Sequence, residues 1–436
     1  MSGLFYFWTM QEFDIFYSSN GICTDTRKIS QNCLFICIKG DNFNGNTFAS
    51  KALEEGALHV IVDDPEYFDS SKAMTLVDNS IEYLQNLANY HRKKFDIPVI
   101  GITGSNGKTT NKELINAVLS KKYNVLATEG NLNNHLGVPF TLLRLNETHD
   151  IAIIEMGANR FKDIEELCAI AEPTHGMITN IGKAHLEGFG GFEGVLKTKR
   201  ELYEAVRAVN GTIFYNNDDE ILENTLPEGS ETYSFGTKHG HVTGELEGLT
   251  PFVKMNWSRN DYSSPTFETN MVGKYNFTNY LASAAIGAFF EVPQEQVTEA
   301  LSKYTPSNNR SQVIRTDRNT LIMDCYNANP TSMRLALESF AMMEHDNKLA
   351  IMGDMKELGN ESDPEHKNML MLCEELDIRN ITVGEEFGKQ VSELRQAHFN
   401  TTDDLLEYLS SDPLDNHLLL LKGSRSIGLE KLENSL

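Results

Sequence analysis

A glycine-rich turn that ends in lysine and threonine constrains this chain more than any other feature. The segment GITGSNGKTT contains Gly104, Gly107, Lys108 and Thr109, follows the apolar run IPVIGIT and precedes the helical pattern KTTNKELINAVLSKK. A buried strand that turns into a helix through glycines gathers backbone amides and the positive end of the helix dipole around one point. The sequence therefore predicts a parallel α/β sheet with a phosphate-binding loop at the end of one strand.

The spacing of this loop differs from that of a strict P-loop. Ile102 stands six residues before Lys108, where a strict P-loop has glycine, so only the variant GxxGxxGKT fits. In such a loop the lysine reaches the β- and γ-phosphates and the threonine hydroxyl reaches Mg²⁺. The alternative is a glycine turn with a surface lysine, and the flanking strand and helix argue against it.

The chain of 436 residues is too long for one ordinary core, and its patterns divide into three segments. We predict an α/β fold of three domains, with a small α/β domain at 1–96, a central P-loop domain at 97–307 and a Rossmann-like domain at 308–436. In the central segment, DIAIIEMG and GMITNIG are short apolar runs followed by glycine. They are typical of central parallel strands whose carboxyl ends line one crevice.

Charge and hydropathy exclude several classes of function. The formal net charge is −24, so the surface repels nucleic acid and anionic lipid. The apolar start MSGLFYFWTMQEF lacks a basic region and a cleavage site, and no apolar run approaches the length of a membrane span. The six cysteines form no CxxC pair. We expect a cytoplasmic protein with reduced thiols, no nucleic-acid partner and no membrane insertion.

Two polar residues near predicted strand ends are candidates for metal binding, and a lysine on a predicted helix lies farther along. Glu155, in IIEMGAN, lies at the end of an apolar strand, His185 follows a strand in TNIGKAHLEGFG, and Lys199 lies in the helical pattern KTKRELYEAV. A carboxylate or imidazole at such a crevice can bind a metal ion. Taken singly, however, each of the three is more often a solvated or structural residue.

Several motifs together, in order, resemble those of the Mur ligase family. They are GITGSNGKTT, EMGAN, NIGKAHLEGFG, the helix with Lys199, GKYNFTNYLASAA and DCYNANPTSM, and they extend over essentially the whole chain. The resemblance implies one domain for a UDP-sugar, one for ATP and one for the incoming amino compound. The segment DTRKISQNCLFICIKGDNFNGNTFASKALEEGA resembles the UDP-binding module of the two later-acting members.

Further resemblance narrows the implied activity. DCYNANPTSM and GDMKELG are similar to the members that add D-alanyl-D-alanine, whereas the DNPR motif of the diaminopimelate-adding members is absent. The implied reaction joins D-alanyl-D-alanine to UDP-N-acetylmuramoyl-tripeptide through an acyl-phosphate, with release of ADP and phosphate, in peptidoglycan precursor synthesis. The implied cofactors are ATP and Mg²⁺, the partners are these small-molecule substrates, and we expect a monomer.

The resemblance also assigns roles to individual residues. The implied catalytic residues are Lys108, Glu155, His185 and Lys199, and the implied metal ligands are Thr109, Glu155, His185 and Lys199. The implied ATP site comprises Gly104, Ser105, Asn106, Gly107, Lys108, Thr109, Thr110, Asn276, Asn279, Arg310, Asp324 and Tyr326. The implied substrate-binding residues are Asp25, Thr26, Arg27, Asn131, Asn133 and Asn134. Lys199 aligns with a lysine that several relatives carbamylate to bridge a second magnesium ion.

Two departures and two rival functions remain. Ser105 replaces the usual threonine of TNGKT, and Asn46 stands where the UDP-binding module commonly has histidine. The nearest rival is another ligase with the same ATP chemistry, such as a diaminopimelate-adding enzyme or a folylpolyglutamate synthase. A P-loop regulatory protein without ligase activity is the rival from another class.

Overall fold

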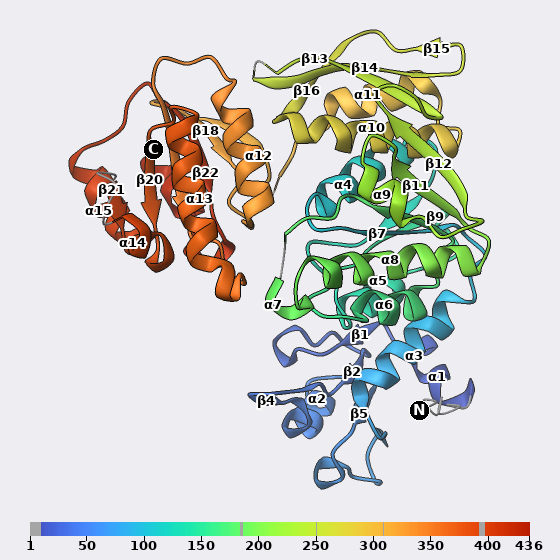
Figure 1. Ribbon diagram of the computed structural model, residues 1–436. Coiled ribbons are helices and arrows are strands. Elements are labelled where there is room, and N and C mark those ends of the chain that lie inside the picture. The colour runs from blue at the N-terminus through green and yellow to red at the C-terminus, as the bar shows by residue number, and fades with distance from the viewer. Residues whose placement is uncertain (1–9, 184–185, 250, 308, 392–396) are drawn as a thin grey trace.

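The computed structural model describes residues 10–183, 186–249, 251–307, 309–391 and 397–436. These residues form three α/β units, each with its own main sheet (Figure 1). In the view of Figure 1 the N-terminal unit lies below the central unit, and the C-terminal unit lies beside it. The predicted class, an α/β protein of three units with parallel sheets, is confirmed.

The N-terminal unit has a parallel sheet of order β1-β2-β5-β6 and a short hairpin, β3-β4. Its elements are α1 (Met10–Tyr17), β1 (Ile22–Cys23), β2 (Leu34–Ile36), β3 (Lys39–Gly40), β4 (Phe43–Asn44), α2 (Ala49–Glu54), β5 (His59–Val62), β6 (Met74–Leu76) and α3 (Ser80–Arg92). Helix α3 begins where the Asn79 side chain caps the amides of Ile81 and Glu82. Its apolar face packs into the same core as the central strands, so these two units are joined by a continuous interior.

The central unit contains a ten-stranded sheet whose main path runs β15-β14-β13-β12-β11-β10-β7-β9-β8, with β16 paired to β14. Its strands are β7 (Val99–Thr103), β8 (Val125–Ala127), β9 (Ile151–Glu155), β10 (His175–Ile178), β11 (Thr212–Asn216), β12 (Glu231–Gly236), β13 (Val242–Gly248), β14 (Phe252–Arg259), β15 (Tyr262–Ser263) and β16 (Phe267–Val272). Strands β7 to β13 pair in parallel, as expected for fully buried apolar runs. The antiparallel extension β13 to β16 was not foreseen from the sequence patterns.

Helices cover both faces of the central sheet. They are α4 (Lys108–Leu119), α5 (Gly137–Leu142), α6 (Asp163–Ala171), α7 (Leu186–Phe189), α8 (Phe192–Ala208), α9 (Glu220–Thr225), α10 (Lys274–Phe289) and α11 (Gln294–Lys303). Helices α5, α6 and α8 pack in one core with the N-terminal unit. Helices α4, α10 and α11 pack on the other face with the antiparallel extension. Helix α10 is buried for most of its length, as its apolar sequence predicts.

The C-terminal unit is a six-stranded sheet of order β17-β18-β22-β19-β20-β21, in which only the β17-β18 pair is antiparallel. Its elements are β17 (Gln312–Arg315), β18 (Thr320–Met323), α12 (Pro330–Ala341), β19 (Lys348–Gly353), α13 (Ser362–Glu375), β20 (Asn380–Val383), α14 (Glu385–Val391), β21 (Ala397–Phe399), α15 (Thr402–Ser411) and β22 (Leu418–Lys422). Two cores, one on each face, make this a doubly wound layer structure. The alternation of strands with helices agrees with the predicted Rossmann-like class.

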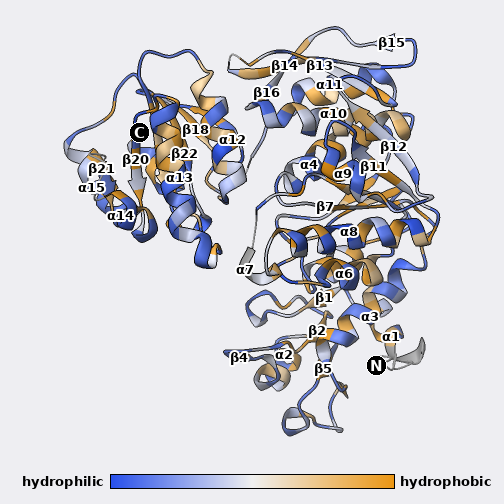
Figure 2. Cartoon of the chain, viewed as in Figure 1, coloured by the Kyte–Doolittle hydropathy of each residue, from blue (hydrophilic) through white to orange (hydrophobic). Residues whose placement is uncertain are grey.

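Hydropathy follows this layering, because the central strands are mostly apolar and the outward helix faces are mostly polar (Figure 2). No helix in the described part of the chain is long and apolar enough to cross a membrane. All six cysteines are free, and only Cys23 is not fully buried.

Candidate active site

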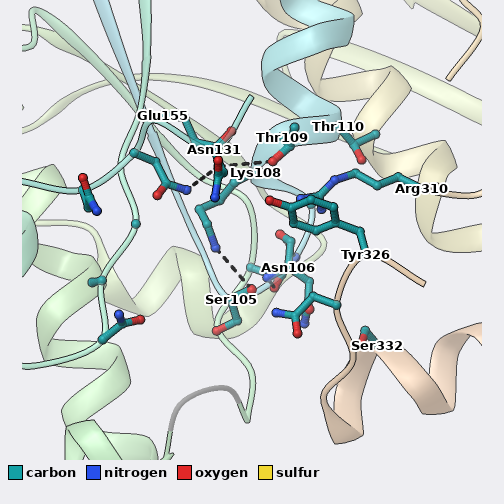
Figure 3. Close-up of a pocket in the computed structure, with 18 of the residues that line it drawn as sticks. Ser105, Asn106, Lys108, Thr109, Thr110, Asn131, Glu155, Arg310, Tyr326 and Ser332 are labelled. Atoms are coloured by element: carbon teal, nitrogen blue, oxygen red, sulfur yellow. Dashed lines mark hydrogen bonds between the residues drawn. The ribbon is translucent and has the colours of Figure 1, made fainter. Parts of the chain in front are cut away.

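One large cavity, of about 1000 Å³, collects residues from all three units. The lining includes Gly40 and Asp41 from the β3-β4 hairpin, the loop after β7, and Asp324 and Tyr326 after β18. Segments at the ends of strands from three different sheets therefore meet at this cavity. Figure 3 shows Lys108, Thr109 and Glu155 together on one side of the space, with Arg310 and Tyr326 approaching from the other.

The phosphate loop is held in shape by the segment after β10. The Ser105 amide donates to the Asn180 carbonyl oxygen and the Asn106 amide donates to Asn180 Oδ1, each at 3.0 Å. Gly104 has φ +146°, and a Cβ at this position would lie 1.9 Å from Thr179 Oγ1. Only glycine fits such a position, so the loop is preorganised before any ligand binds.

Lys108 begins α4 and directs its ammonium back over the loop. Its Nζ donates to the Gly104 carbonyl at 2.6 Å. Burial lowers the pKa of Lys108, Glu155 raises it and Arg310 lowers it further. The ammonium and the loop amides thus surround a space suited to a polyanion such as triphosphate.

Glu155 ends β9 and is 1% exposed. Its Oε1 accepts from Thr109 Oγ1 at 3.2 Å and from Asn133 Nδ2 at 2.8 Å. Its Oε2 is buried and has no hydrogen-bond partner among the described residues. A buried carboxylate oxygen without a donor is costly unless a cation or water completes it.

This arrangement fits a magnesium ion. Mg²⁺ prefers oxygen ligands and is bound through one or two protein groups plus substrate phosphates and water. Thr109 Oγ1 and the unpartnered Glu155 oxygen supply such ligands beside the phosphate loop. No cluster of three His, Cys, Asp or Glu side chains appears in the described ranges, and His185 lies outside them.

Lys199 lies on α8 and is 2% exposed. Burial lowers its pKa well below the ordinary range, and the positive charge of Lys108 lowers it further. Its Nζ lies 5.8 Å from the centre of the Phe189 ring. Lys199 is therefore not the solvated helix residue that its position alone would favour, and a lysine of low pKa can react as a neutral amine.

Asn276 and Asn279 lie on α10, at the edge of the cavity, in a relay of amides. Asn111 Nδ2 donates to Asn279 Oδ1 at 2.8 Å, Asn279 Nδ2 donates to Asn276 Oδ1 at 2.9 Å, and Asn276 Nδ2 donates to the Val272 carbonyl. The relay ties α10 to α4, which begins at the phosphate loop.

The C-terminal unit contributes a stacked and ion-paired group. The guanidinium carbon of Arg310 lies 3.8 Å from the centre of the Tyr326 ring, and that of Arg425 lies 5.3 Å from it. Asp324 Oδ2 accepts from Lys422 Nζ at 2.6 Å, and Asp324 Oδ1 accepts from the Ser311 amide at 3.2 Å. Planar and cationic groups of this kind suit a nucleotide.

A direct contact joins the phosphate loop to the C-terminal unit. Asn329 Nδ2 donates to Asn106 Oδ1 at 2.7 Å, and Asn329 also caps α12 in a capping box with Ser332. The neighbouring Lys183 pairs with Glu365 at 2.9 Å. Any motion of the C-terminal unit therefore acts directly on the phosphate loop.

The predicted substrate residues fall in two places. Asn131, Asn133 and Asn134 line the cavity, whereas the segment Asp25 to Arg27 does not. Asp25 instead caps a short 3-10 helix, Thr26–Lys28, and pairs with Arg27, which is exposed. The Arg27 side chain lowers the pKa of Asp25 to about 2.

Asn46 is fully buried and serves the N-terminal fold. Its Nδ2 donates to Asp63 Oδ1 at 2.7 Å, and its Oδ1 accepts from the Asp63 amide at 3.0 Å. This side chain joins two loops of the small unit.

Further polar residues at the cavity were not predicted. They are Asp41, His135, Asn159, Arg160, Asp163, Glu166, Asn180, Tyr275, Ser311, Asn327, Ser332 and Lys422. The sequence held a signal for two of them, because Lys422 ends an apolar strand as Glu155 does and Asn180 lies two residues after the end of β10.

The family comparison agrees with this fold. Family models match residues 19–117 as "Mur ligase family, catalytic domain", 102–287 as "Mur ligase middle domain" and 309–425 as "Mur ligase, glutamate ligase domain". Together with full-length relatives above 30% identity, these matches show that the chain belongs to the Mur ligase family.

Particular relatives are more specific. The UDP-N-acetylmuramoyl-tripeptide–D-alanyl-D-alanine ligase of Bacillus subtilis is 34% identical, over 96% of this chain and 93% of its own. A crystal structure of MurF from Acinetobacter baumannii superposes with a TM-score of 0.89 at 29% identity, covering 98% of each chain. MurF ligase from Thermotoga maritima in complex with ADP has a TM-score of 0.86 at 25% identity, covering 97% of each chain.

Proposed function

We propose that this chain is the ATP-dependent ligase that adds D-alanyl-D-alanine to UDP-N-acetylmuramoyl-tripeptide. One observation carries the proposal: a single cavity is lined by the phosphate loop, by the asparagine loop 131–134 and by Arg310, Asp324 and Tyr326. A nucleotide, the carboxylate that is to be activated and the incoming amine can therefore meet in one place. Similarity along the full length to ligases of this specificity supports the choice of substrates.

The first chemical step activates a carboxylate. An oxygen of the tripeptide's terminal carboxylate attacks the γ-phosphorus of ATP, a new P–O bond forms, and the bond to the ADP oxygen breaks. Lys108 and the loop amides hold the phosphates in line, which is catalysis by positioning and electrostatics. When bound by Thr109 and Glu155, Mg²⁺ would neutralise charge on the transferred phosphoryl group.

The second step forms the amide. The neutral amine of D-alanyl-D-alanine attacks the acyl carbon, inorganic phosphate leaves with the C–O bond electrons, and the nitrogen loses one proton. The cationic groups beside the cavity can stabilise the oxyanion of the tetrahedral intermediate. Exclusion of water matters because an acyl-phosphate hydrolyses, and the Asn106–Asn329 contact would help to close the C-terminal unit over the site.

The proposed roles extend to the remaining predicted residues. Residues 1–96 would bind the UDP moiety through Asp25, Thr26 and Arg27, 97–307 would bind ATP, and 308–436 would deliver the dipeptide. His185 and Lys199 would complete the metal sites, with Lys199 as a carbamate. We further propose a cytoplasmic monomer.

Phosphate release tests this proposal. The purified chain would be given ATP, Mg²⁺ and UDP-N-acetylmuramoyl-tripeptide, with D-alanyl-D-alanine, diaminopimelate, glutamate or no amine. We expect turnover that depends on D-alanyl-D-alanine. Turnover with diaminopimelate or glutamate alone would leave the family intact but refute the substrate, and ATP binding without any turnover would favour the regulatory rival.

A further inference from the structure

Lys112, one turn after the phosphate loop, is a buried lysine in an unusual setting. It is 0% exposed, and its Nζ donates to the Thr128 carbonyl at 2.7 Å and to the Gly130 carbonyl at 3.4 Å. The Glu113 carboxylate lies 2.9 Å from the same nitrogen and balances its charge. Lysine is almost never fully buried unless it is paired, so this ammonium has a specific position.

The carbonyls that receive Lys112 belong to the loop that connects β8 to α5. The same loop carries Asn131, Asn133 and Asn134 to the cavity. Other contacts also hold the start of this loop: the Thr128 amide donates to the Ile153 carbonyl at 3.0 Å, and Arg144 donates to the Ala127 carbonyl at 3.1 Å and pairs with Glu129 at 2.9 Å. Those contacts lead to β9 and to the end of α5, whereas Lys112 ties the loop to α4.

Thr128 connects this anchor to Glu155. Its carbonyl accepts from Lys112, and its hydroxyl accepts from the Glu155 amide at 3.0 Å. Farther along the loop, Asn133 Nδ2 donates to Glu155 Oε1 at 2.8 Å. The loop thus contacts both the backbone and the carboxylate of Glu155, the residue whose free oxygen could bind magnesium.

We propose that Lys112 is a positioning residue that fixes the loop 128–135 and, through Thr128 and Asn133, the orientation of Glu155. Lys112 is not among the residues that line the cavity. The proposal rests on the proposed function, because it takes Glu155 as a magnesium ligand and the asparagine loop as the muramoyl-peptide site. The phosphate loop has separate support from Asn180, so its shape does not depend on Lys112.

The first test compares Lys112→Met with the unchanged protein. Hydrogen exchange followed by mass spectrometry should show faster exchange in peptides covering 127–136. Substitutions just outside the ligands of a metal commonly cost about tenfold or more in metal affinity. Mg²⁺ is expected to strengthen ADP binding, and in Lys112→Met the Mg²⁺ concentration that gives half of this effect should rise about tenfold. The KM for the tripeptide substrate should rise by a similar factor. The affinity for ADP without Mg²⁺ should not change.

Arg92→Met is a matched control. Arg92 is also buried and donates to three carbonyls, those of Phe95, Ala171 and Glu172, at the junction of α3 and α6. Both Arg92→Met and Lys112→Met should lower the melting temperature. Arg92→Met, however, should change neither the hydrogen exchange of residues 127–136 nor the Mg²⁺ concentration that ADP binding requires. A purely structural role for Lys112 would make the two variants behave alike, and that result would overturn the proposal.

Two milder variants keep the test open if Lys112→Met folds poorly. Thr128→Val removes the hydroxyl that accepts from Glu155 but keeps the carbonyl, so the Mg²⁺ requirement should rise without loss of the fold. Lys112→Arg keeps the cation and should recover part of the Mg²⁺ affinity. An unchanged Mg²⁺ requirement in Thr128→Val would refute the proposal that Thr128 links Lys112 to Glu155. Exchange and ADP binding are measured without the peptide substrates, so they test Lys112 even if the proposed turnover fails.

Discussion

Replacing Asp324 with asparagine removes the carboxylate that pairs with the ammonium of Lys422. Lys422 is 2% exposed and its Nζ lies 2.6 Å from Asp324 Oδ2. Asparagine keeps one oxygen, which can accept from either Lys422 or the Ser311 amide but no longer balances the cation. The variant therefore leaves a buried positive charge without its counterion.

The magnitude follows from this geometry. Removing one partner of a buried ion pair costs about 3–5 kcal/mol, and losing a hydrogen bond to a charged group costs about 1.5–3 kcal/mol. The Asp324 side chain is 16% exposed at the cavity edge, so the lower range applies. We expect a loss of about 2 kcal/mol, which corresponds to a melting temperature lower by about 4–8 °C.

Thermal unfolding of the two single variants and the double variant measures this coupling. Asp324→Asn combined with Lys422→Met removes both charges, so its melting temperature should be higher than that of Asp324→Asn alone. An Asp324→Asn variant as stable as the unchanged protein would refute the reasoning. So would a double variant whose loss equals the sum of the two single losses, because independent sites add and paired sites do not.

Three further predictions address the phosphate loop and the fold. Gly104→Ala places a Cβ 1.9 Å from Thr179 Oγ1 at a φ of +146°, and strain of about 1–3 kcal/mol should weaken ADP binding about tenfold or more in calorimetry. Asn329→Ala removes a helix cap and the hydrogen bond to Asn106, so stability should fall by about 1 kcal/mol and KM for ATP should rise in steady-state assays. Burial lowers the pKa of His175 from 6.5 to about 4. Between these two pH values the unfolded chain binds more protons than the folded chain, so stability falls as the pH drops from 6.5 towards 4. His175→Phe should flatten that fall in melting curves taken between pH 7 and pH 5, and an equally steep fall would contradict this assignment.

The local patterns of the sequence predicted much of the fold because they reflect short-range physics. The turn from Gly104 to Thr109 needs glycine for its backbone geometry, and the sequence shows glycine at those positions directly. Glu155 ends a buried strand of the central sheet and Asp324 follows a buried strand of the C-terminal sheet, and within each sheet the parallel strands bring their carboxyl ends to one edge. The place of each residue at such an edge was therefore predictable, whereas their meeting at one cavity depends on how the two units pack.

Long-range contacts account for what the patterns missed. Lys112 and Lys199 have the local sequence of exposed helix residues, and they are buried because distant segments pack over them. Lys112 is covered by the carbonyls of a loop that begins sixteen residues later. The antiparallel strands β13 to β16 form the far edge of the central sheet, where pairing with neighbours outweighs weak local preference.

An isotope experiment tests the central claim of amide formation through an acyl-phosphate most directly. UDP-N-acetylmuramoyl-tripeptide labelled with ¹⁸O at both oxygens of its terminal carboxylate would be incubated with the protein, ATP, Mg²⁺ and D-alanyl-D-alanine. The masses of the released phosphate and of the pentapeptide would then be measured by mass spectrometry. We expect one ¹⁸O atom in the released phosphate and one in the new amide carbonyl of the pentapeptide. Unlabelled phosphate, or labelled phosphate without a pentapeptide, would contradict the account.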